Sequence, residues 1–149
     1  LGTFTLDEES DRPMVFMGGG TGFAPLKGQV EHAFQAGIDR PMVLYWGVRS
    51  ERDLYMSELP EQWALEHPNF KFVPVLSEPD DGWQGRTGWV HESVIADIPD
   101  LSGHDLYMAG PPPMVNAARA AFRAAGMPDE HMHCDSFDYA EDSQAKSAD

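Results

Sequence analysis

A glycine-rich stretch near the start of this 149-residue chain constrains its fold more than any other feature. The apolar residues 14–17 run directly into the glycine-rich segment 18–22, and Pro25 follows shortly after. Beyond Pro25, apolar residues recur at helical spacing and Gly37 supplies a stop signal. These apolar residues are Leu26, Val30, Ala33 and Phe34. The stretch predicts a buried strand, a tight turn and a helix that starts at Pro25.

A glycine turn between a strand and a helix is suited to binding an anion. Glycines let the backbone approach a ligand and allow positive φ, so several N–H groups can point at one phosphate. The following helix adds the positive end of its dipole. Thr21 can donate a hydrogen bond from its hydroxyl group. Pro25 is tolerated at the start of the helix, because the N–H that proline lacks would have no partner in the helix at that position. A turn that binds nothing is the alternative, so a phosphate site needs support from elsewhere in the chain.

Two familiar phosphate-binding loops do not match this segment. The dinucleotide fingerprint needs glycines at its first, third and sixth positions, and the sixth position counted from Gly18 is Phe23. A Walker loop ends in Gly-Lys-Ser or Gly-Lys-Thr, whereas Lys27 is followed by Gly28 and Gln29. The turn therefore belongs to another kind of loop.

Charge and hydropathy exclude several classes of partner. The chain carries 25 acidic and 10 basic residues and has a net charge of −15. We therefore expect no nucleic-acid partner, because the chain has no surplus of basic residues to neutralise the phosphates. The acidic surface is either simply solvated or a docking face for a basic protein. No apolar run reaches the roughly 18 residues of a transmembrane helix, and no signal peptide is recognisable. The single cysteine, Cys134, rules out an internal disulfide, so we expect a cytoplasmic protein without membrane contact.

The length predicts one compact domain, which we place at residues 13–137. Residues 1–12 read as the end of a preceding unit followed by a polar linker, which suggests a piece of a longer polypeptide. Residues 138–149 are polar and acidic, and we expect them to form a disordered tail.

Apolar runs bounded by turn residues predict four more strands, at 41–46, 70–76, 105–109 and 132–137. Helical segments are expected between them, near 50–56, 61–66, 90–95 and 114–125. Pro74 cannot donate to a sheet ladder, so its strand is expected at an edge. Strands that alternate with helices imply right-handed crossovers. The fold class is therefore α/β, a doubly wound five-stranded parallel sheet with helices on both faces.

Ligands bind beyond the carboxyl ends of the strands in a sheet of this kind. That edge would gather the four unusual segments of the chain, which are 18–22, 47–50, the polar loop from Ser77, and 110–114. Because all of them fall on one side of the sheet, they support a ligand site far better than the glycine turn does alone.

Four sequence motifs occur at these loops. They are Gly-Gly-Gly-Thr-Gly-x-x-Pro at 18–25, Trp-Gly-Val-Arg-Ser at 46–50 with Asp-Leu-Tyr at 53–55, Gly-Arg-Thr-Gly at 85–88, and Gly-Pro-Pro-Pro-Met at 110–114. In these motifs and their order, the chain resembles the NAD(P)H-binding domain of the ferredoxin–NADP reductase superfamily. It is most similar to the reductase components of bacterial multicomponent oxygenases of the phenol, toluene or benzoate type and to CDP-6-deoxyhexose reductases.

The resemblance implies a role for each loop. The glycine turn would cradle the pyrophosphate, the second loop would lie against the adenosine ribose, and the last would line the nicotinamide pocket. The implied cofactor-binding residues are Gly18, Gly19, Gly20, Thr21, Gly22, Pro25, Gly47, Arg49, Ser50, Asp53, Gly110, Pro111, Pro112 and Met114. No catalytic side chain is implied. The family's usual cysteine before the last loop is replaced here by Ala109.

The resemblance also implies cofactors and partners. Residues 1–4 look like the end of the family's flavin domain, but the flavin-binding motif and the four cysteines of a ferredoxin module are absent from this sequence. The chain would therefore be the nucleotide-binding part of an NAD(P)H-dependent flavoprotein oxidoreductase, with FAD and a 2Fe–2S module on other domains. A hydride would pass to FAD, and electrons onward to an iron–sulfur centre of an oxygenase or another acceptor.

The choice between NADH and NADPH depends on charge. An adenosine 2′-phosphate needs converging bases, which Arg49 and Arg52 would provide. Glu51, Asp53 and the net charge oppose that phosphate. The similarity to oxygenase reductases implies NADH, with NADPH second.

Two other functions stay open on the sequence alone. One is a standalone dinucleotide-binding or sensing module without redox turnover. The other is a phosphate-binding enzyme on the same fold, for which only Asp53 or His91 could serve as the acid–base group.

The histidine-rich segment 131–134 and the tryptophans are further candidates for ligand contacts. His131 and His133 would share one face of a strand while Cys134 points away, so we predict no metal site there. Trp46 ends a strand and could stack on adenine. Trp63 is expected in the core, and loop-covering roles are expected for Trp83 and Trp89.

Overall fold

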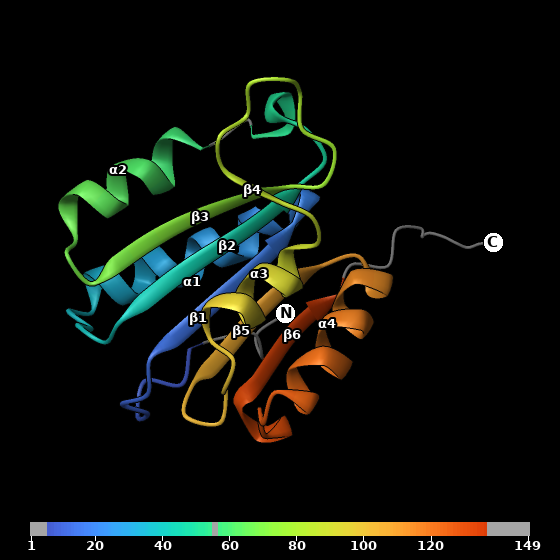
Figure 1. The fold of residues 1–149 in the computed structure, drawn as a ribbon. Coiled ribbons are helices and arrows are strands. Elements are labelled where there is room, and N and C mark those ends of the chain that lie inside the picture. Colours follow the sequence, from blue (N-terminus) through green and yellow to red (C-terminus); the bar gives the residue numbers. More distant parts are fainter. Residues whose placement is uncertain (1–5, 55–56, 137–149) are drawn as a thin grey trace.

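The computed structural model describes residues 6–54 and 57–136, which form a parallel sheet between two layers of helices (Figure 1). The strands are β1 Met14–Gly19, β2 Met42–Val48, β3 Phe70–Leu76, β4 Arg86–Thr87, β5 Asp105–Gly110 and β6 Met132–Ser136. The α-helices are α1 Phe23–Gln35, α2 Glu58–Glu66, α3 Val90–Asp97 and α4 Pro112–Ala124. Short 3-10 turns are η1 Gly20–Gly22, η2 Glu51–Asp53 and η3 Asp129–His131.

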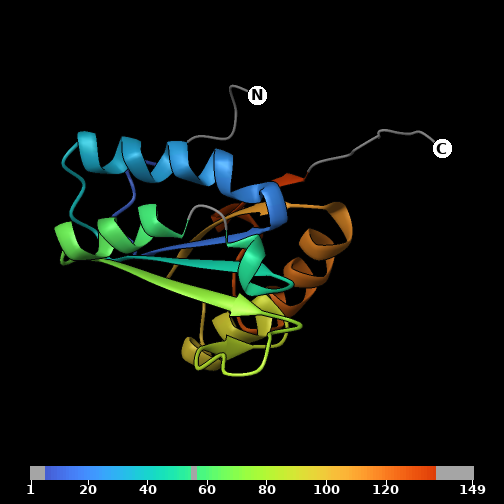
Figure 2. The same ribbon diagram turned by 90° about the horizontal axis from the view of Figure 1, so that it is seen from above.

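The sheet has the order β4-β3-β2-β1-β5-β6, and every neighbouring pair is parallel. Helices α1 and α2 cover one face, and α3 and α4 cover the other (Figure 2). The predicted α/β fold, a doubly wound parallel sheet with helices on both faces, is confirmed. Strand β1 lies at its centre with all of its residues buried, which explains its unbroken apolar run.

The strand count differs from the expected five because β4 lies inside the polar loop that follows β3. It has two exposed residues, too few for any apolar alternation to mark it in the sequence. The prediction that the strand of Pro74 forms an edge is wrong for its last residues, because β4 pairs with Val75 and Leu76. Up to Pro74 itself, β3 pairs with β2 alone, so the missing N–H is tolerated there.

Several helices begin a few residues away from their predicted starts. Helix α1 begins at Phe23 rather than at Pro25, because the 3-10 turn η1 leads directly into it. Pro25 still falls in the first helical turn, where N–H groups have no partner. Helix α4 begins at Pro112, α2 begins at Glu58, and the segment predicted as a helix near 50–56 contains only η2 in its described part.

Helix α1 ends where the glycine signal predicted. Gly37 has φ +74°, and the chain turns back there through hydrogen bonds from Gly37 N to Phe34 O and from Ile38 N to Ala33 O. A glycine after the last helical turn is favoured because it adopts this left-handed conformation without strain.

Predictions for residues 1–5, Tyr55, Phe137 and the tail 138–149 fall outside the described residues. None of the helices in the described part of the chain has the length and apolar character needed to cross a bilayer.

The carboxylate of Asp97 adds to the attachment of the loop before α3, which already pairs with β3 through β4. Asp97 accepts a hydrogen bond from the Tyr45 hydroxyl at 2.8 Å and contacts from Arg86 Nη2 at 2.9 Å to both carboxylate oxygens. Burial, together with the neighbouring Asp97, raises the pKa of the Tyr45 hydroxyl. These contacts join β2, β4 and the last residue of α3.

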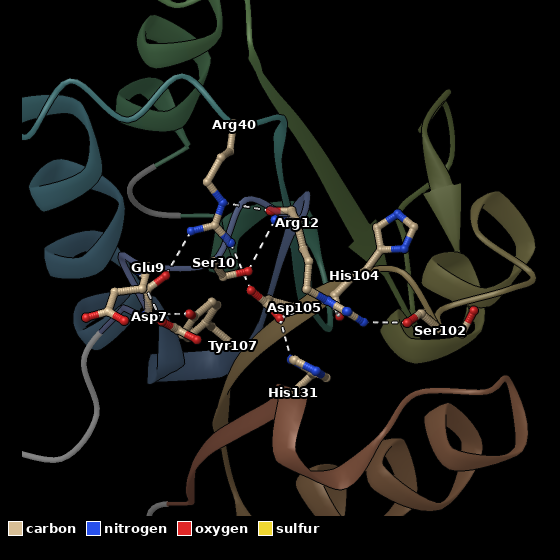
Figure 3. Close-up of polar contacts among 10 residues, drawn as sticks. All are labelled: Asp7, Glu9, Ser10, Arg12, Arg40, Ser102, His104, Asp105, Tyr107 and His131. Atoms are coloured by element: carbon tan, nitrogen blue, oxygen red, sulfur yellow. Dashed lines mark hydrogen bonds and ion pairs between the residues drawn. The ribbon is translucent and has the colours of Figure 1, made fainter.

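A second carboxylate, that of Asp105, is fully buried at the amino end of β5. Asp105 contacts Arg40 Nη2 at 2.9 Å, Arg12 Nε at 3.3 Å and His131 Nδ1 at 2.9 Å. Figure 3 shows the two arginines and the histidine converging on it from different elements. A buried carboxylate is costly unless it is paired, so these partners are required for Asp105 to stay inside.

The same cluster holds the segment that precedes β1. Arg40 donates through Nε to the Arg12 carbonyl at 2.7 Å and through Nη1 to the Asp7 carbonyl at 3.0 Å. The Asp7 N–H donates to the Tyr107 hydroxyl at 2.8 Å, and Leu6 is buried in the core. Residues 6–12 therefore pack on this sheet, while the assignment of residues 1–12 to a preceding domain stays a prediction.

We expect Arg40→Ala to lower the free energy of unfolding by about 3–5 kcal/mol, because it removes the most buried cation from Asp105. Chemical denaturation checks this. Arg123→Ala is the matched control, since its ion pair with Asp129 is solvent-exposed and contributes at most about 1 kcal/mol. If both variants lost the same free energy of unfolding, the buried pairing of Asp105 would not contribute more to stability than an exposed ion pair.

Candidate functional site

A cleft of about 560 Å³ opens at the carboxyl ends of the central strands. The four unusual loops of the sequence all contribute to it, as the fold class predicted. Its lining residues are Gly19, Gly20, Gly47, Val48, Arg49, Arg52, Asp53, Ser77, Gly88, Trp89, Val90, Pro111 and Met114.

Half of the predicted cofactor-binding residues line this cleft. They are Gly19, Gly20, Gly47, Arg49, Asp53, Pro111 and Met114. The others that the structure describes are not among its lining residues, namely Gly18, Gly22, Pro25, Ser50, Gly110 and Pro112. The side chain of Thr21 lies outside the described part. Ligand contacts at all of these positions stay predictions.

The glycines of the first loop differ in what surrounds them, and only Gly22 lies against backbone closely enough to exclude a side chain. A Cβ atom on Gly22 would overlap the carbonyl oxygen of Ala109, so the turn after β1 lies directly on the backbone of β5. A Cβ on Gly19 would overlap the Met114 sulfur, and one on Gly110 would lie 2.5 Å from the Met114 Cε. Gly22 therefore lets the turn after β1 rest on β5, whereas Gly19 and Gly110 face the flexible end of the Met114 side chain.

Gly20 differs from its neighbours. It has φ +56°, and a Cβ there would meet nothing within 4 Å. Its side-chain position is therefore open, and it lines the cleft. A left-handed residue at the start of a strand-to-helix turn is typical of backbone that surrounds an anion.

Trp46 supports this turn from beneath. The ring is fully buried, stacks on Phe23 at 4.7 Å between centroids, and donates from Nε1 to the Gly20 carbonyl at 3.2 Å. The suggestion that Trp46 stacks on adenine is therefore wrong, because its faces are already packed. Trp63 lies in the core as expected.

The second loop contains a small capping motif. Asp53 Oδ2 accepts hydrogen bonds from the Ser50 backbone N at 3.1 Å and from Ser50 Oγ at 3.3 Å. Ser50 is buried and caps the turn η2, so its hydroxyl is used within the loop. Arg49 lies 3.9 Å from Glu78, and both side chains are exposed.

The third wall comes from the start of α3. Val90 packs over Gly47, where a Cβ would lie 2.6 Å from the Val90 Cβ, so the amino end of α3 sits on the end of β2. The sequence predicts the polar loop with the Gly-Arg-Thr-Gly motif at this edge, but the predicted cofactor-binding residues include none on this wall. Six lining residues are outside the predicted cofactor-binding set, namely Val48, Arg52, Ser77, Gly88, Trp89 and Val90. Of these, Arg52 is the base considered for a 2′-phosphate, and Ser77 begins the polar loop that was expected at this edge.

The His-Met-His-Cys segment is used in packing. His131 contacts Asp105, and His133 stacks on Tyr107 at 4.7 Å between ring centroids. Burial raises the pKa of the Cys134 thiol, which disfavours the nucleophilic thiolate. Within residues 6–54 and 57–136, no group of three or more His, Cys, Asp or Glu side chains is placed to hold a metal ion.

Comparison with known proteins gives consistent matches. The model of the oxidoreductase NAD-binding domain family matches residues 16–120. The chain is 41% identical over 136 residues to a CDP-6-deoxy-L-threo-D-glycero-4-hexulose-3-dehydrase reductase of Yersinia pestis, covering 91% of this chain and 41% of that one. It is 41% identical over 141 residues to an aromatic O-demethylase reductase subunit of Amycolatopsis, covering 92% and 42%.

The same pattern holds for solved structures. The cytochrome P450 reductase GcoB of Amycolatopsis superimposes with a TM-score of 0.85 at 40% identity, over 92% of this chain and 42% of that one. The chain thus spans less than half the length of these relatives.

We expect Gly22→Ala to destabilise the fold by about 1–3 kcal/mol, because its methyl group would push the turn off the Ala109 carbonyl. Gly28→Ala is the control. That glycine is exposed within α1 with open space around it, and alanine there should stabilise by about 0.5–1 kcal/mol. Thermal unfolding of both variants checks the pair. A Gly22→Ala variant as stable as the parent would contradict the close approach between the turn and the Ala109 carbonyl.

Proposed function

Because the chain belongs to the oxidoreductase NAD-binding domain family, we propose that its cleft binds NADH and presents the nicotinamide to a flavin on another domain. The observation that carries the proposal is the meeting of the glycine turn, the arginine-bearing loop and the proline-rich loop in one cleft. The resemblance to the ferredoxin–NADP reductase superfamily is confirmed by the family match and by the reductase relatives.

The pyrophosphate would lie against the turn after β1. Support comes from Gly20, whose left-handed backbone and open side-chain position leave room for a ligand beside the chain. The turn leads into α1, so the helix presents its amino end near the same place. The residues present therefore fit a phosphate group.

The nicotinamide would lie toward the proline-rich loop. Pro111 and Met114 line the cleft there, and Met114 lies over the glycine surfaces of Gly19 and Gly110. Ala109 is fully buried next to this end, in place of the family's usual cysteine. Positioning the ring for hydride transfer would rest on these packed, mostly apolar contacts.

The adenosine end would favour NADH over NADPH. Asp53 lines the cleft with its carboxylate held by Ser50, and it would repel a 2′-phosphate. Arg49 lies near Glu78, which offsets part of its charge. Arg52 favours NADPH instead, because its exposed guanidinium group lines the adenosine end of the cleft and could attract a 2′-phosphate. The chain's net charge of −15 adds to the penalty for the extra phosphate.

In the reaction, NADH would supply a hydride and the flavin would accept it, so the cofactors carry the chemistry. The residues of this chain would bind and orient the nucleotide and keep its nicotinamide at the open end of the cleft. We further propose that a 2Fe–2S module and an oxygenase or another acceptor receive the electrons in the cytoplasm. The reductase names of the relatives support this more than they support a standalone sensing module.

Calorimetric titration of the chain with NADH and NADPH side by side tests the cofactor assignment. We expect saturable binding of NADH and weaker binding of NADPH, because of the repulsion at Asp53. Tighter binding of NADPH would contradict the specificity, and absence of binding by both nucleotides would contradict the proposed function.

Two substitutions of one residue test the phosphate position. Asn and Asp both tolerate the left-handed backbone of Gly20, and both side chains would enter the cleft. We expect Gly20→Asp to weaken NADH binding by at least about tenfold more than Gly20→Asn, because only the first adds a negative charge beside the pyrophosphate. Equal affinities in the two variants would place the phosphates elsewhere.

A further inference from the structure

A second groove, of about 620 Å³, lies on the α3 face of the sheet near the amino ends of the strands. The residues that define this amino-end groove are Val15, Val43, Lys71, Val73, Ile98 and His104. The groove shares no lining residue with the nucleotide cleft, although β1, β2 and α3 contribute to both. Its volume is within the roughly 300–1,000 Å³ that is usual for small-molecule sites.

The groove is open because α3 is too short to cover the strands beneath it. Helix α3 has eight residues and is about 12 Å long, whereas β2 has seven residues and is about 23 Å long. The helix begins over Gly47, at the carboxyl end of β2, and ends at Asp97 beside Tyr45. Within the described part of the chain, the amino ends of β2 and β3 therefore carry no helix on this face (Figure 1).

The floor of the groove is a row of three side chains from neighbouring strands. Val15 pairs with Val43 across β1 and β2, and Val43 pairs with Lys71 across β2 and β3. Val15 is fully buried, Val43 is half-buried and Lys71 is exposed. The row thus changes from apolar to cationic over two strand spacings, about 10 Å.

The walls of the groove are mostly apolar. The prolines that precede β1, β2 and β3 all contribute to it, namely Pro13, Pro41 and Pro68. Proline has no N–H, so these positions add apolar surface without adding a donor. Ile98 follows the end of α3 and completes the wall on that side. The amide of Asn69 is already used, because it donates to the Arg40 carbonyl at 2.8 Å.

Lys71 has no partner within residues 6–54 and 57–136, where it makes neither an ion pair nor a hydrogen bond. The other lysine in these ranges, Lys27, contacts Glu31 at 3.0 Å. Lys71 is therefore a free cation at the end of an apolar floor, on a chain with a net charge of −15.

The remaining ionisable groups of the groove leave the charge of Lys71 uncompensated. Arg86 and Asp97 neutralise each other through contacts of 2.9 Å to both carboxylate oxygens. Burial, together with the nearby Arg12, lowers the pKa of His104, so its ring is uncharged at neutral pH. A ligand in the groove would meet apolar surface and one cation.

We propose that the amino-end groove binds a small organic acid with an apolar ring system and one anionic group. The ring lies on Val15 and Val43 and against Ile98, and the anionic group pairs with Lys71. The charge of the lysine selects an acid over a neutral ligand of the same shape. This inference goes beyond the proposed function and does not depend on it, because the groove and the nucleotide cleft have no lining residue in common.

Calorimetric titration with 2-naphthoate and 2-naphthamide tests the charge preference. The two probes share a ring system, and only the first is an anion. We expect one 2-naphthoate to bind per chain and 2-naphthamide to bind about three- to fivefold more weakly, since an exposed ion pair contributes up to about fivefold. The net charge of −15 repels anions in general, so this preference would report a local cation. Absence of 2-naphthoate binding, or equal affinity for both probes, would overturn the proposal.

Two lysine substitutions test which cation is used. Lys71→Gln and Lys27→Gln change the net charge equally, but Lys27 lies on α1, on the other face of the sheet. We expect Lys71→Gln to raise the Kd of 2-naphthoate by about three- to fivefold and to leave that of 2-naphthamide unchanged. Lys27→Gln should leave both Kd values unchanged. The same Kd for 2-naphthoate in the two variants would overturn the assignment to Lys71.

A substitution in the floor tests the location of the ring. Val43→Phe adds a ring where that of the ligand would lie, and we expect it to raise the Kd of 2-naphthoate by at least about tenfold. The half-buried Val43 faces the groove, so the added atoms have room, and the thermal unfolding midpoint checks that the variant folds. A folded Val43→Phe that binds like the parent would overturn the proposal. If the variant does not fold, the two lysine variants decide.

Two further results would assign the groove or the probe differently. Displacement of 2-naphthoate by NADH would place the acid in the nucleotide cleft and overturn the proposal. Sedimentation analysis tests whether a second copy of the chain covers the groove. A parent dimer that becomes a monomer in Val43→Phe would overturn the proposal in favour of that second copy. The titration with NADH alone tests the proposed function separately from all of these measurements.

Discussion

The contact of the turn after β1 with the end of β5 sets the geometry of the carboxyl edge. Gly22 lies so close to the Ala109 carbonyl that any side chain would separate the two loops. With that contact in place, Met114 can lie across Gly19 and Gly110 and form one end of the cleft. The glycine turn thus serves packing at Gly22, while Gly19 and Gly20 line the cleft and the side-chain position of Gly20 is open.

The two edges of the sheet are held by different forces. The carboxyl edge depends on close backbone approach and apolar contact, which leave it open to a ligand. The amino edge depends on the buried Asp105 and its cationic partners, Arg40 and Arg12. Such a pairing tolerates little change, because removing one partner leaves a charge inside the protein. Strands β1 and β5 connect the two edges, so the cleft is built on elements fixed at both ends.

The parts of the fold that could be predicted were those with a local signal. The apolar run and glycines around β1 specify a strand and a turn whatever surrounds them. The Ser-x-x-Asp spacing at Ser50 likewise marks a capping motif, although the family resemblance implies a ligand contact for the same two residues. Strand β4 has no local signal, because its two residues are exposed and only their pairing with Val75 and Leu76 makes them a strand. The exposure of Trp89 depends in the same way on how Val90 packs over Gly47.

The anchoring of the segment before β1 has a mechanical consequence. Arg40 binds the carbonyl groups of Asp7 and Arg12, so this segment is part of the same rigid body as the sheet. Each central strand is a stiff rod of about 20 Å, from that anchor to the cleft. A rotation of the chain at Leu6 therefore rotates the cleft through the same angle. The orientation of a bound nucleotide would change by rotation of the whole domain and not by bending within the domain.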